Sequence, residues 1–399
     1  MVIRKGYKQT ELGIVPKDWE TKSLSECEKI TMGQSPESKY YNKSGDGLPL
    51  IQGNADIENR KTIVRVFTSE FPKIGKVDDI IMTVRAPVGN IAKATFDCCL
   101  GRGVCSISSK NNYLYHYLIF IENRWKSMST GSIFDSINYD GLSKLEIKIP
   151  KSTKEQELIA KSLSDIDNLI HSLESIIQKK KNIKQGAMQE LLTGKRRLEG
   201  FSEEWNTKRI IDFTDVTSGG TPSTLIKEYW NGDIRWMNSG ELNLKKVFDV
   251  EGRITPLGLK KSATKLIPKN CILIGLAGQG KTRGTVAMNY VELCINQSIG
   301  AIKPNESFNP EFLYYNLDLR YEELRKMSSD SEGRGGLNLT LLRNISVYLP
   351  SNKKEQDAIV KILSDMDSEI EQLEKQLEKY TNLKQAMMQK LLTGEIRLV

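Results

Sequence analysis

A stretch of 49 residues that occurs twice determines how this chain is organised. Residues 150–198 read PKSTKEQELIAKSLSDIDNLIHSLESIIQKKKNIKQGAMQELLTGKRRL, and residues 350–398 read PSNKKEQDAIVKILSDMDSEIEQLEKQLEKYTNLKQAMMQKLLTGEIRL. The copies lie 200 positions apart, align without a gap and share 25 identical residues. A repeat of this size predicts two structural halves built to one plan, and a function that also comes in two halves.

Apolar side chains in each copy recur at alternating steps of four and three residues. This heptad spacing is typical of a helix whose apolar seam packs in a coiled coil. The second seam contains one charged residue, Lys384, whereas the first contains Lys180 and Lys184. We expect each seam to pack against the other copy, and dimerisation with a second chain is the alternative. The seam residues are Ile159, Leu163, Ile166, Ile170, Leu173 and Ile177 in the first copy, and Ile359, Leu363, Met366, Ile370, Leu373 and Leu377 in the second.

Both copies carry the boundary signals of a helix. Ser152 and Thr153 follow Pro150 as candidate N-caps, and Gly194 and Gly394 close the shared LLTG motif. Hydroxyl side chains cap helix N-termini, and glycine adopts the left-handed conformation in which many helices end. Each copy therefore predicts a helix of some 40 residues, which at about 1.5 Å per residue forms a rod of roughly 60 Å.

The composition predicts a soluble globular protein with a polyanionic partner. The 399 residues are 39% hydrophobic and 27% charged, and a chain of this length favours two or more domains. The formal charge of +8 favours a polyanion as the binding partner. No apolar run approaches the roughly 18 residues of a membrane span, so we expect the protein in the cytoplasm.

The cysteines and histidines offer little for catalysis or metal binding. Six cysteines are scattered without the paired spacing of a zinc site, and we expect buried, reduced thiols. Of the two histidines, His171 lies where the second copy has Glu371, so we expect it on a solvated surface. No catalytic signature stands out elsewhere, and the sequence predicts a binding protein rather than an enzyme.

The globular segments that precede the two helices also correspond, more loosely. Trp19 matches Trp205, 186 positions further on, so the second segment must carry 14 additional residues. The stretch Gly33–Pro36 matches Gly219–Pro222. A common scaffold with divergent loops is typical of two binding domains with different targets, because loops on a rigid frame carry the recognition residues.

Residues 275–282, GLAGQGKT, satisfy the phosphate-loop pattern GxxxxGK[ST]. A phosphate loop must open a helix whose N-terminus faces the phosphates. Here Thr282 is followed by RGTVA, a glycine turn that enters a strand, and the matching loop at residues 85–89 lacks the motif. We therefore predict a hairpin loop that offers donors to phosphates or base edges, with a P-loop NTPase as the alternative function.

Five motifs in order resemble those of the specificity (S) subunit of type I restriction-modification systems, and the resemblance covers nearly the whole chain. The motifs are TELGIVPKDW at 10–19, RAPVG at 85–89, GLAGQGKTRG at 275–284, KEQ followed by LSDID or LSDMD at each helix start, and LLTG, two residues and RL at each helix end.

The resemblance implies an α+β, non-catalytic subunit with two α/β target-recognition domains. These domains would span residues 1–152 and 195–352, each followed by a long helix, residues 153–194 and 353–394. The helices would form an antiparallel coiled coil with pseudo-two-fold symmetry, which spaces the domains on an asymmetric, bipartite double-stranded DNA target.

The resemblance also implies the partners. Two adenine methyltransferase subunits would dock on the helices, and restriction subunits would join through the complex. S-adenosylmethionine, ATP and magnesium are then expected only on the partner subunits, with no cofactor or metal on this chain. A coiled-coil scaffold that makes no DNA contact is the remaining alternative.

Polar residues in the loops are the candidate DNA contacts. Arginine, lysine and the side-chain amides bond to base edges and phosphates, and a lysine cluster at 179–181 with Lys184 is either a phosphate contact or a solvated helix face. The loop candidates are Gln52, Asn54, Arg85, Asn90, Arg102, Asn238, Ser239, Gln279, Lys281, Thr282, Arg283, Asn296, Gln297 and Arg334.

The two ends of the chain also fit the repeat. The segment at 10–19 takes the place that LLTGKRRLEGFSEEW holds before the second globular segment, and the C-terminal LLTGEIRL would run naturally into it. We therefore expect the two ends to lie close together.

Overall fold

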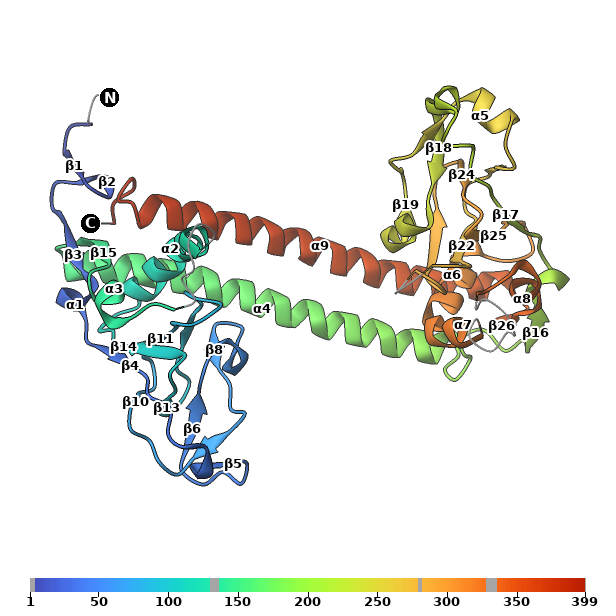
Figure 1. Ribbon diagram of the computed structural model, residues 1–399. Coiled ribbons are helices and arrows are strands. Elements are labelled where there is room, and N and C mark those ends of the chain that lie inside the picture. The colour runs from blue at the N-terminus through green and yellow to red at the C-terminus, as the bar shows by residue number, and fades with distance from the viewer. Residues whose placement is uncertain (1–3, 130–135, 279–281, 328–335, 399) are drawn as a thin grey trace. The chain divides into compact units, whose positions relative to one another are not determined.

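The computed structural model describes residues 4–129, 136–278, 282–327 and 336–398, and the chain divides into two compact units (Figure 1). Unit 1 comprises residues 1–175 and 375–399, and unit 2 comprises residues 176–374. Each unit holds one globular domain, domain 1 (residues 4–152) or domain 2 (residues 195–352), together with part of each long helix.

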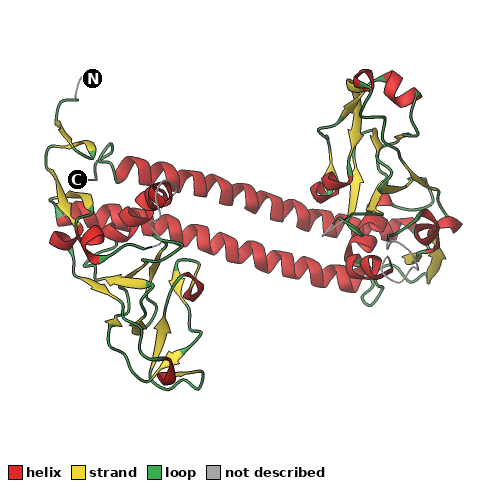
Figure 2. Ribbon diagram, viewed as in Figure 1, coloured by secondary structure: helices red, strands yellow, loops and turns green. Residues whose placement is uncertain are grey.

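The repeated sequence forms the two long helices α4 (Thr153–Leu191) and α9 (Lys353–Leu391), each of 39 residues (Figure 2). Every predicted seam position is buried or half-buried. The heptad pattern therefore identified the apolar face of each helix correctly.

The helix ends follow the sequence signals. The amide of Glu155 donates to Ser152 Oγ at 3.3 Å, so Ser152 is the N-cap and Thr153 is the first helical residue. Gly194 and Gly394 have φ angles of +68° and +73°, the left-handed conformation that was predicted for them.

In unit 1, the end of α9 lies against the start of α4. Ile159 and Leu163 share a buried cluster with Leu391. Lys384, the charged residue in the second seam, contacts the carboxylate of Asp167 at 2.6 Å. The charge of Lys384 in the seam is therefore paired with an aspartate of the LSDID motif.

Unit 2 repeats this arrangement with the helices exchanged. Ile359 and Leu363 of α9 share a buried cluster with Leu191 of α4. Lys184, a charged residue of the first seam, donates to the carboxylate of Asp367 in the LSDMD motif. In each unit, the start of one long helix therefore packs against the end of the other.

Domain 1 is built on two sheets, in which most neighbouring strands are antiparallel. A six-stranded sheet has the order β4 (Ile30–Met32), β14 (Val104–Ile107), β11 (Ile80–Thr83), β12 (Ile91–Lys93), β8 (Lys61–Thr62) and β7 (Ile57–Glu58). A five-stranded sheet has the order β10 (Ile74–Gly75), β13 (Cys98–Leu100), β6 (Leu48–Ile51), β9 (Phe67–Thr68) and β5 (Tyr41–Asn42).

Domain 2 has the same plan with fewer strands. A five-stranded sheet has the order β17 (Val216–Ser218), β25 (Ile299–Ile302), β22 (Ile272–Gly275), β23 (Val286–Asn289) and β19 (Lys246–Val247). A four-stranded sheet has the order β20 (Arg253–Ile254), β18 (Trp230–Met237), β24 (Leu293–Ile295) and β21 (Leu266–Ile267). Strands β17, β25, β22 and β23 correspond to β4, β14, β11 and β12 of domain 1.

One further helix in each domain joins the sheets to the long helices. Tyr113 and Tyr117 of α2 (Tyr113–Ser129) belong to the buried cluster that contains strand residues of β11 and seam residues of α4. Phe312 of α6 (Pro310–Leu319) has the same place in the cluster of unit 2. The sheet of each domain is therefore fixed to the long helices through one continuous core.

The remaining elements connect these parts. A two-stranded sheet links β3 (Trp19–Ser23) to β15 (Glu146–Pro150) in domain 1, and its counterpart links β16 (Trp205–Arg209) to β26 (Ser346–Pro350) in domain 2. Strands β1 (Tyr7–Thr10) and β2 (Gly13–Pro16) form an N-terminal hairpin. The short helices are α1 (Leu24–Cys27), α3 (Tyr139–Ser143), α5 (Pro256–Lys260), α7 (Tyr321–Met327) and α8 (Leu339–Asn344), and the 3-10 turns are η1 (Ser38–Tyr40), η2 (Asn54–Asp56), η3 (Ile210–Asp212), η4 (Lys227–Tyr229) and η5 (Ser239–Leu244).

The two ends of the chain are in contact within unit 1, as predicted. The hydroxyl of Tyr7 donates to the carbonyl of Gly394 at 2.9 Å. Arg397 donates to both carboxylate oxygens of Asp18 at 2.9 and 2.6 Å.

The thiols and His171 also lie where the sequence placed them. Five of the six free cysteines are buried, and burial raises the pKa of Cys98 and Cys105 to about 12. The side chain of His171 is 65% exposed. In the part of the chain that the structure describes, no helix has the length and apolarity needed to cross a membrane.

Candidate nucleic-acid interface

Three loops of domain 1 meet where the chain passes from one sheet to the other. They are residues 33–36 after β4, residues 52–54 after β6 and residues 101–103 between β13 and β14. The amide of Gln34 donates to Leu100 O at 2.8 Å, and the amide of Gly101 donates to Ile51 O at 2.8 Å. Backbone hydrogen bonds therefore connect the three loops.

The side chains at this junction are exposed and polar. Gln52 and Arg102, both predicted as DNA contacts, lie on two of the three loops and are exposed. Gln52 Nε2 donates to the hydroxyl of Tyr41 at 3.1 Å, and the amide of Arg102 donates to Ser35 Oγ at 3.0 Å. The fold thus brings together residues that lie up to 67 positions apart.

The loop between β11 and β12 adjoins this junction. It holds Arg85, which is exposed, and Asn90, whose Nδ2 donates to Asn54 Oδ1. Arg60 Nη1 donates to Asn90 Oδ1 at 3.3 Å. Asn54 and Asn90 therefore join the two groups of candidates in domain 1 into one polar surface.

Domain 2 repeats the three-loop junction. The corresponding loops are residues 219–222, 238–240 and 296–298, which again connect strands of different sheets. The amide of Gly220 donates to Ile295 O at 3.0 Å, and the amide of Asn296 donates to Met237 O at 3.0 Å.

The polar side chains of the second junction differ in their hydrogen-bond partners. Asn238 Nδ2 donates to Glu241 at 2.9 Å, and Asn296 Oδ1 accepts from the amide of Ser298 at 3.1 Å, so both side chains shape their own loops. Ser239 is half-buried in η5. Gln297 is exposed, and its Oε1 accepts from the hydroxyl of Thr221 at 2.6 Å.

The β22–β23 loop contains the GLAGQGKT motif and is a hairpin, as predicted. Its strands pair antiparallel, and the amide of Thr285 donates to Thr282 O at 3.1 Å in a turn that enters β23. A strand follows the motif where a phosphate loop requires a helix, which argues against the NTPase alternative. Thr282 and Arg283 are half-buried in this loop. Gln279, Lys281 and Arg334 lie outside the described residues.

Ser35 and Thr221 are the members of these junctions that the sequence did not single out. Each follows one of the matched glycines, in Gly33–Pro36 and Gly219–Pro222. The matched glycines and prolines indicated that both domains retain this loop. The partner of each hydroxyl residue, 67 positions away for Ser35 and 76 for Thr221, is set by the fold.

The lysine cluster on α4 is largely engaged by acidic residues of α9. Lys180 contacts Glu369 at 2.6 Å and Lys181 contacts Glu374 at 2.7 Å. Lys184 donates to Asp367, as described above. Helix pairing within unit 2 therefore engages three of the four lysines of the cluster, Lys180, Lys181 and Lys184.

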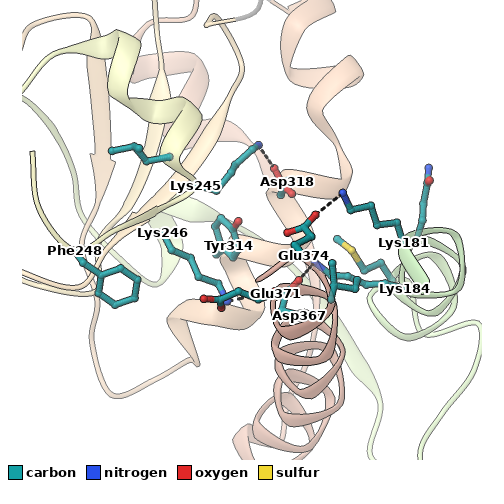
Figure 3. A pocket seen from close by; sticks show the side chains of 14 residues that line it. Lys181, Lys184, Lys245, Lys246, Phe248, Tyr314, Asp318, Asp367, Glu371 and Glu374 are labelled. Atoms are coloured by element: carbon teal, nitrogen blue, oxygen red, sulfur yellow. Dashed lines mark hydrogen bonds and ion pairs between the residues drawn. The ribbon is translucent and has the colours of Figure 1, made fainter. Parts of the chain in front are cut away.

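A cavity of about 540 Å³ in unit 2 lies beside this cluster, between the long helices and domain 2 (Figure 3). Lys246 contacts Asp367 at 3.5 Å, and the hydroxyl of Tyr315 donates to the same carboxylate at 2.7 Å. Burial acts to raise the pKa of Asp367, but hydrogen bonds from Lys184 and Tyr315 outweigh it, and the net pKa is lowered. The cavity is thus lined by paired charges that attach domain 2 to the helices.

The described residues hold no group of three or more histidine, cysteine, aspartate or glutamate side chains that could bind a metal ion. The chemistry that the two junctions do offer is hydrogen bonding by guanidinium and amide groups on rigid loops. Such groups recognise base edges and phosphates.

Both halves of the chain match the model of a known protein family. Residues 16–185 and 202–380 match the family model described as "Type I restriction modification DNA specificity domain". The chain is 36% identical over 202 residues to the candidate specificity subunit of the MjaX type I restriction enzyme of Methanocaldococcus jannaschii, a match that covers 49% of this chain and 47% of that relative. It therefore spans about half the length of this relative.

Two further likenesses extend over nearly the whole chain. The type I restriction enzyme MjaVIII specificity subunit of the same organism is 22% identical over 406 residues, which cover 96% of this chain and 94% of the relative. The crystal structure of a type I restriction-modification S subunit from M. genitalium has the same fold, with a TM-score of 0.65, 17% identity and 98% of both chains covered. On the strength of the two matched segments, the chain belongs to the type I restriction modification DNA specificity domain family and carries that domain twice.

Proposed function

We propose that this chain is the subunit that gives a type I restriction-modification complex its DNA sequence specificity. Each domain reads one half of a bipartite target through its three-loop junction. The two halves differ in sequence because the two junctions carry different side chains on one scaffold.

One observation carries this proposal. The loops at 101–103 and 296–298 have the same place between corresponding strands, yet one presents Arg102 and the other presents Gln297. A retained frame with exchanged polar side chains is what two readers of different sequences require.

The long helices set the distance between the half-sites in this proposal. We infer that they form one antiparallel coiled coil with pseudo-two-fold symmetry, which the seam contacts within each unit support. A helix of 39 residues is about 58 Å long, and two sites on one face of DNA lie about 34 Å apart or at a multiple of it. A stiff rod fixes such a spacing better than a flexible linker.

The catalytic steps belong to partner subunits. Two adenine methyltransferase subunits, which bind S-adenosylmethionine, dock on the helices, and restriction subunits that use ATP and magnesium join through the complex. Methylation requires the adenine to leave the base stack, so the DNA-bound subunit positions each methyltransferase pocket beside its half-site. This chain contributes binding and orientation and no catalytic group.

Methylome sequencing of cells that express the chain with its methyltransferase partner tests the proposal. The expected result is methylation of a split, asymmetric motif. Insertion of seven residues at matched positions of α4 and α9 keeps the seam in register and lengthens each helix by about 10 Å, so the motif with the wild-type spacer should no longer be methylated. An unbroken palindrome, or a spacer that ignores the insertion, contradicts it.

A DNA-binding assay distinguishes the proposed specificity subunit from a coiled-coil scaffold that makes no DNA contact. A specificity subunit in complex with its methyltransferase shifts a target duplex in a gel at low salt, whereas a scaffold that makes no DNA contact does not. The variant Lys281→Ala tests the NTPase alternative. If the loop is a DNA-reading hairpin, neither the wild-type chain nor the variant should bind ATP. At saturating protein concentration, the variant should also methylate the wild-type motif as the wild type does.

A further inference from the structure

The loops 101–103 and 296–298 hold their central residue in the same way. Gly103 O accepts from the amide of Val84 at 2.8 Å, and Ser298 O accepts from the amide of Leu276 at 2.8 Å. The residue before the centre also donates its amide to the neighbouring strand in both loops. Backbone bonds thus fix both sides of the central residue, Arg102 in one loop and Gln297 in the other.

Around these loops, neighbouring backbone segments approach so closely that a side chain would not fit at three glycines. A Cβ atom on Gly103 would lie 2.1 Å from Gln52 O, and one on Gly33 would lie 2.1 Å from Gly101 O. The corresponding atom on Gly219 would lie 1.7 Å from Ile295 O. The loops are therefore preorganised, which base recognition needs because a contact displaced by an ångström loses its discrimination.

A hydroxyl residue contacts each central residue from the neighbouring loop. Ser35 Oγ accepts from the backbone amide of Arg102 at 3.0 Å, so it fixes the loop and leaves the guanidinium available. Thr221 Oγ1 donates to Gln297 Oε1 at 2.6 Å, so it fixes the orientation of the side-chain amide. One lone pair of Oε1 and both hydrogens of Nε2 remain for a ligand.

The two exposed groups match different bases. An arginine fork donates two parallel hydrogen bonds to O6 and N7 of guanine, and a glutamine amide accepts from N6 and donates to N7 of adenine. Among the described residues, the structure gives the Arg102 guanidinium no hydrogen bond or ion pair, and Arg102 and Gln297 are both exposed.

We propose that Arg102 selects a guanine in one half-site and Gln297 selects an adenine in the other. This inference rests on the proposed DNA-reading function and assigns the two equivalent positions that set its specificity. The other polar groups of each junction then hold the loop or contact the DNA backbone.

Exchange of the two side chains tests the assignment. The full chain in complex with its methyltransferase is used to methylate a duplex library, and the methylated motif is sequenced for wild type, Arg102→Gln and Gln297→Arg. In Arg102→Gln, one guanine in one half-site should lose about 10- to 100-fold in preference, with adenine gaining there. In Gln297→Arg, the preference at one position of the other half-site should change from adenine to guanine. In each variant, the half-site that the substitution does not affect is the internal control.

Arg102→Lys separates base reading from phosphate binding. Lysine keeps the charge but lacks the planar fork, so it should weaken the guanine preference while it preserves most of the affinity for non-specific DNA. Thermal unfolding of each variant is compared with wild type to confirm that the fold is retained.

The possible failures are distinct. If wild type methylates a split motif and both exchange variants keep that motif at every base pair, the assignment of Arg102 and Gln297 is wrong while the DNA-reading function stands. A loss of methylation that is uniform over all sequences also overturns the assignment, because it indicates a backbone or structural contact. If wild type methylates no split motif, the proposed function itself fails.

Discussion

Glu155 accepts hydrogen bonds from Arg397 at both carboxylate oxygens, at 2.6 and 2.8 Å, although 242 positions separate the two residues. The indole of Trp19 donates to the same carboxylate at 3.3 Å. Arg197 and Glu355 form the same pair in unit 2. Each RL motif at a helix end thus closes on the KEQ motif at the start of the other helix within its unit.

Arg397→Met is expected to destabilise unit 1 by about 3 kcal/mol. The carboxylate of Glu155 is only 1% exposed, and removal of the guanidinium leaves a buried charge without its main partner. Urea unfolding of the full chain, followed by hydrogen exchange in each unit, measures the loss. Arg196→Met is the matched control, because the Arg196 side chain is 73% exposed and should cost almost nothing. Equal stabilities of the two variants would contradict the role of the buried pair.

Gly33→Ala and Gly219→Ala should each disable one half-site. The added Cβ would lie 2.1 Å from Gly101 O in domain 1 and 1.7 Å from Ile295 O in domain 2, so the junction loops must separate, at a cost of about 1–3 kcal/mol or more. Sequencing of the methylated motif should show relaxed recognition in a different half for each variant. Gly53→Ala lies in the same region with nothing within 4 Å of the new atom, and an unchanged motif is expected for it.

His116 should make the stability of unit 1 depend on pH in the acid range. The side chain is 1% exposed, and burial lowers its pKa from 6.5 to about 4, against the opposing carboxylate of Asp167 at 3.9 Å. His116 binds a proton near pH 6.5 in the unfolded chain, but only near pH 4 in the folded chain. The stability that the neutral, buried imidazole contributes is therefore complete above pH 6.5 and is lost as the pH falls toward 4. The loss amounts to roughly 3 kcal/mol at pH 4.

Denaturation between pH 7 and 4 checks this expectation. His116→Gln should flatten the dependence, whereas His171→Gln should not alter it, because His171 is on the surface. A slope that survives in His116→Gln would assign the effect to other groups.

Arg85 and Lys181 should differ in their effect on the salt dependence of DNA binding. Arg85 is exposed beside the domain 1 junction, whereas Lys181 is paired with Glu374 at 2.7 Å. If Arg85 contacts a phosphate, Arg85→Ala should lower the slope of log K against log salt by about 0.9, and Lys181→Ala should leave the slope near its wild-type value. Titrations of the complex with target duplex at several salt concentrations measure both. The reverse order of effects would place the DNA backbone along α4 instead.

The repeat architecture follows from local patterns of residues. The heptad seam, the N-cap at Ser152 or Thr153 and the glycines at 194 and 394 are local signals, since each depends on residues within a turn or two of helix. Of the two cap candidates, the structure selects Ser152. The β22–β23 hairpin could also be predicted, because the glycine turn after Thr282 is incompatible with a phosphate loop. The family resemblance, carried by short motifs in order, is confirmed by the two matched segments.

Which polar residues lie together depends on long-range contacts in the fold. The candidate list mixed residues whose side chains bond within their own loops, such as Asn238 and Asn296, with residues whose side chains do not, such as Arg102 and Gln297, because all have similar chemistry in the sequence. It also passed over Ser35 and Thr221, whose partners lie 67 and 76 positions away. These contacts form where the chain crosses between two sheets, and a crossing depends on strand order, a long-range property that no local pattern of residues encodes.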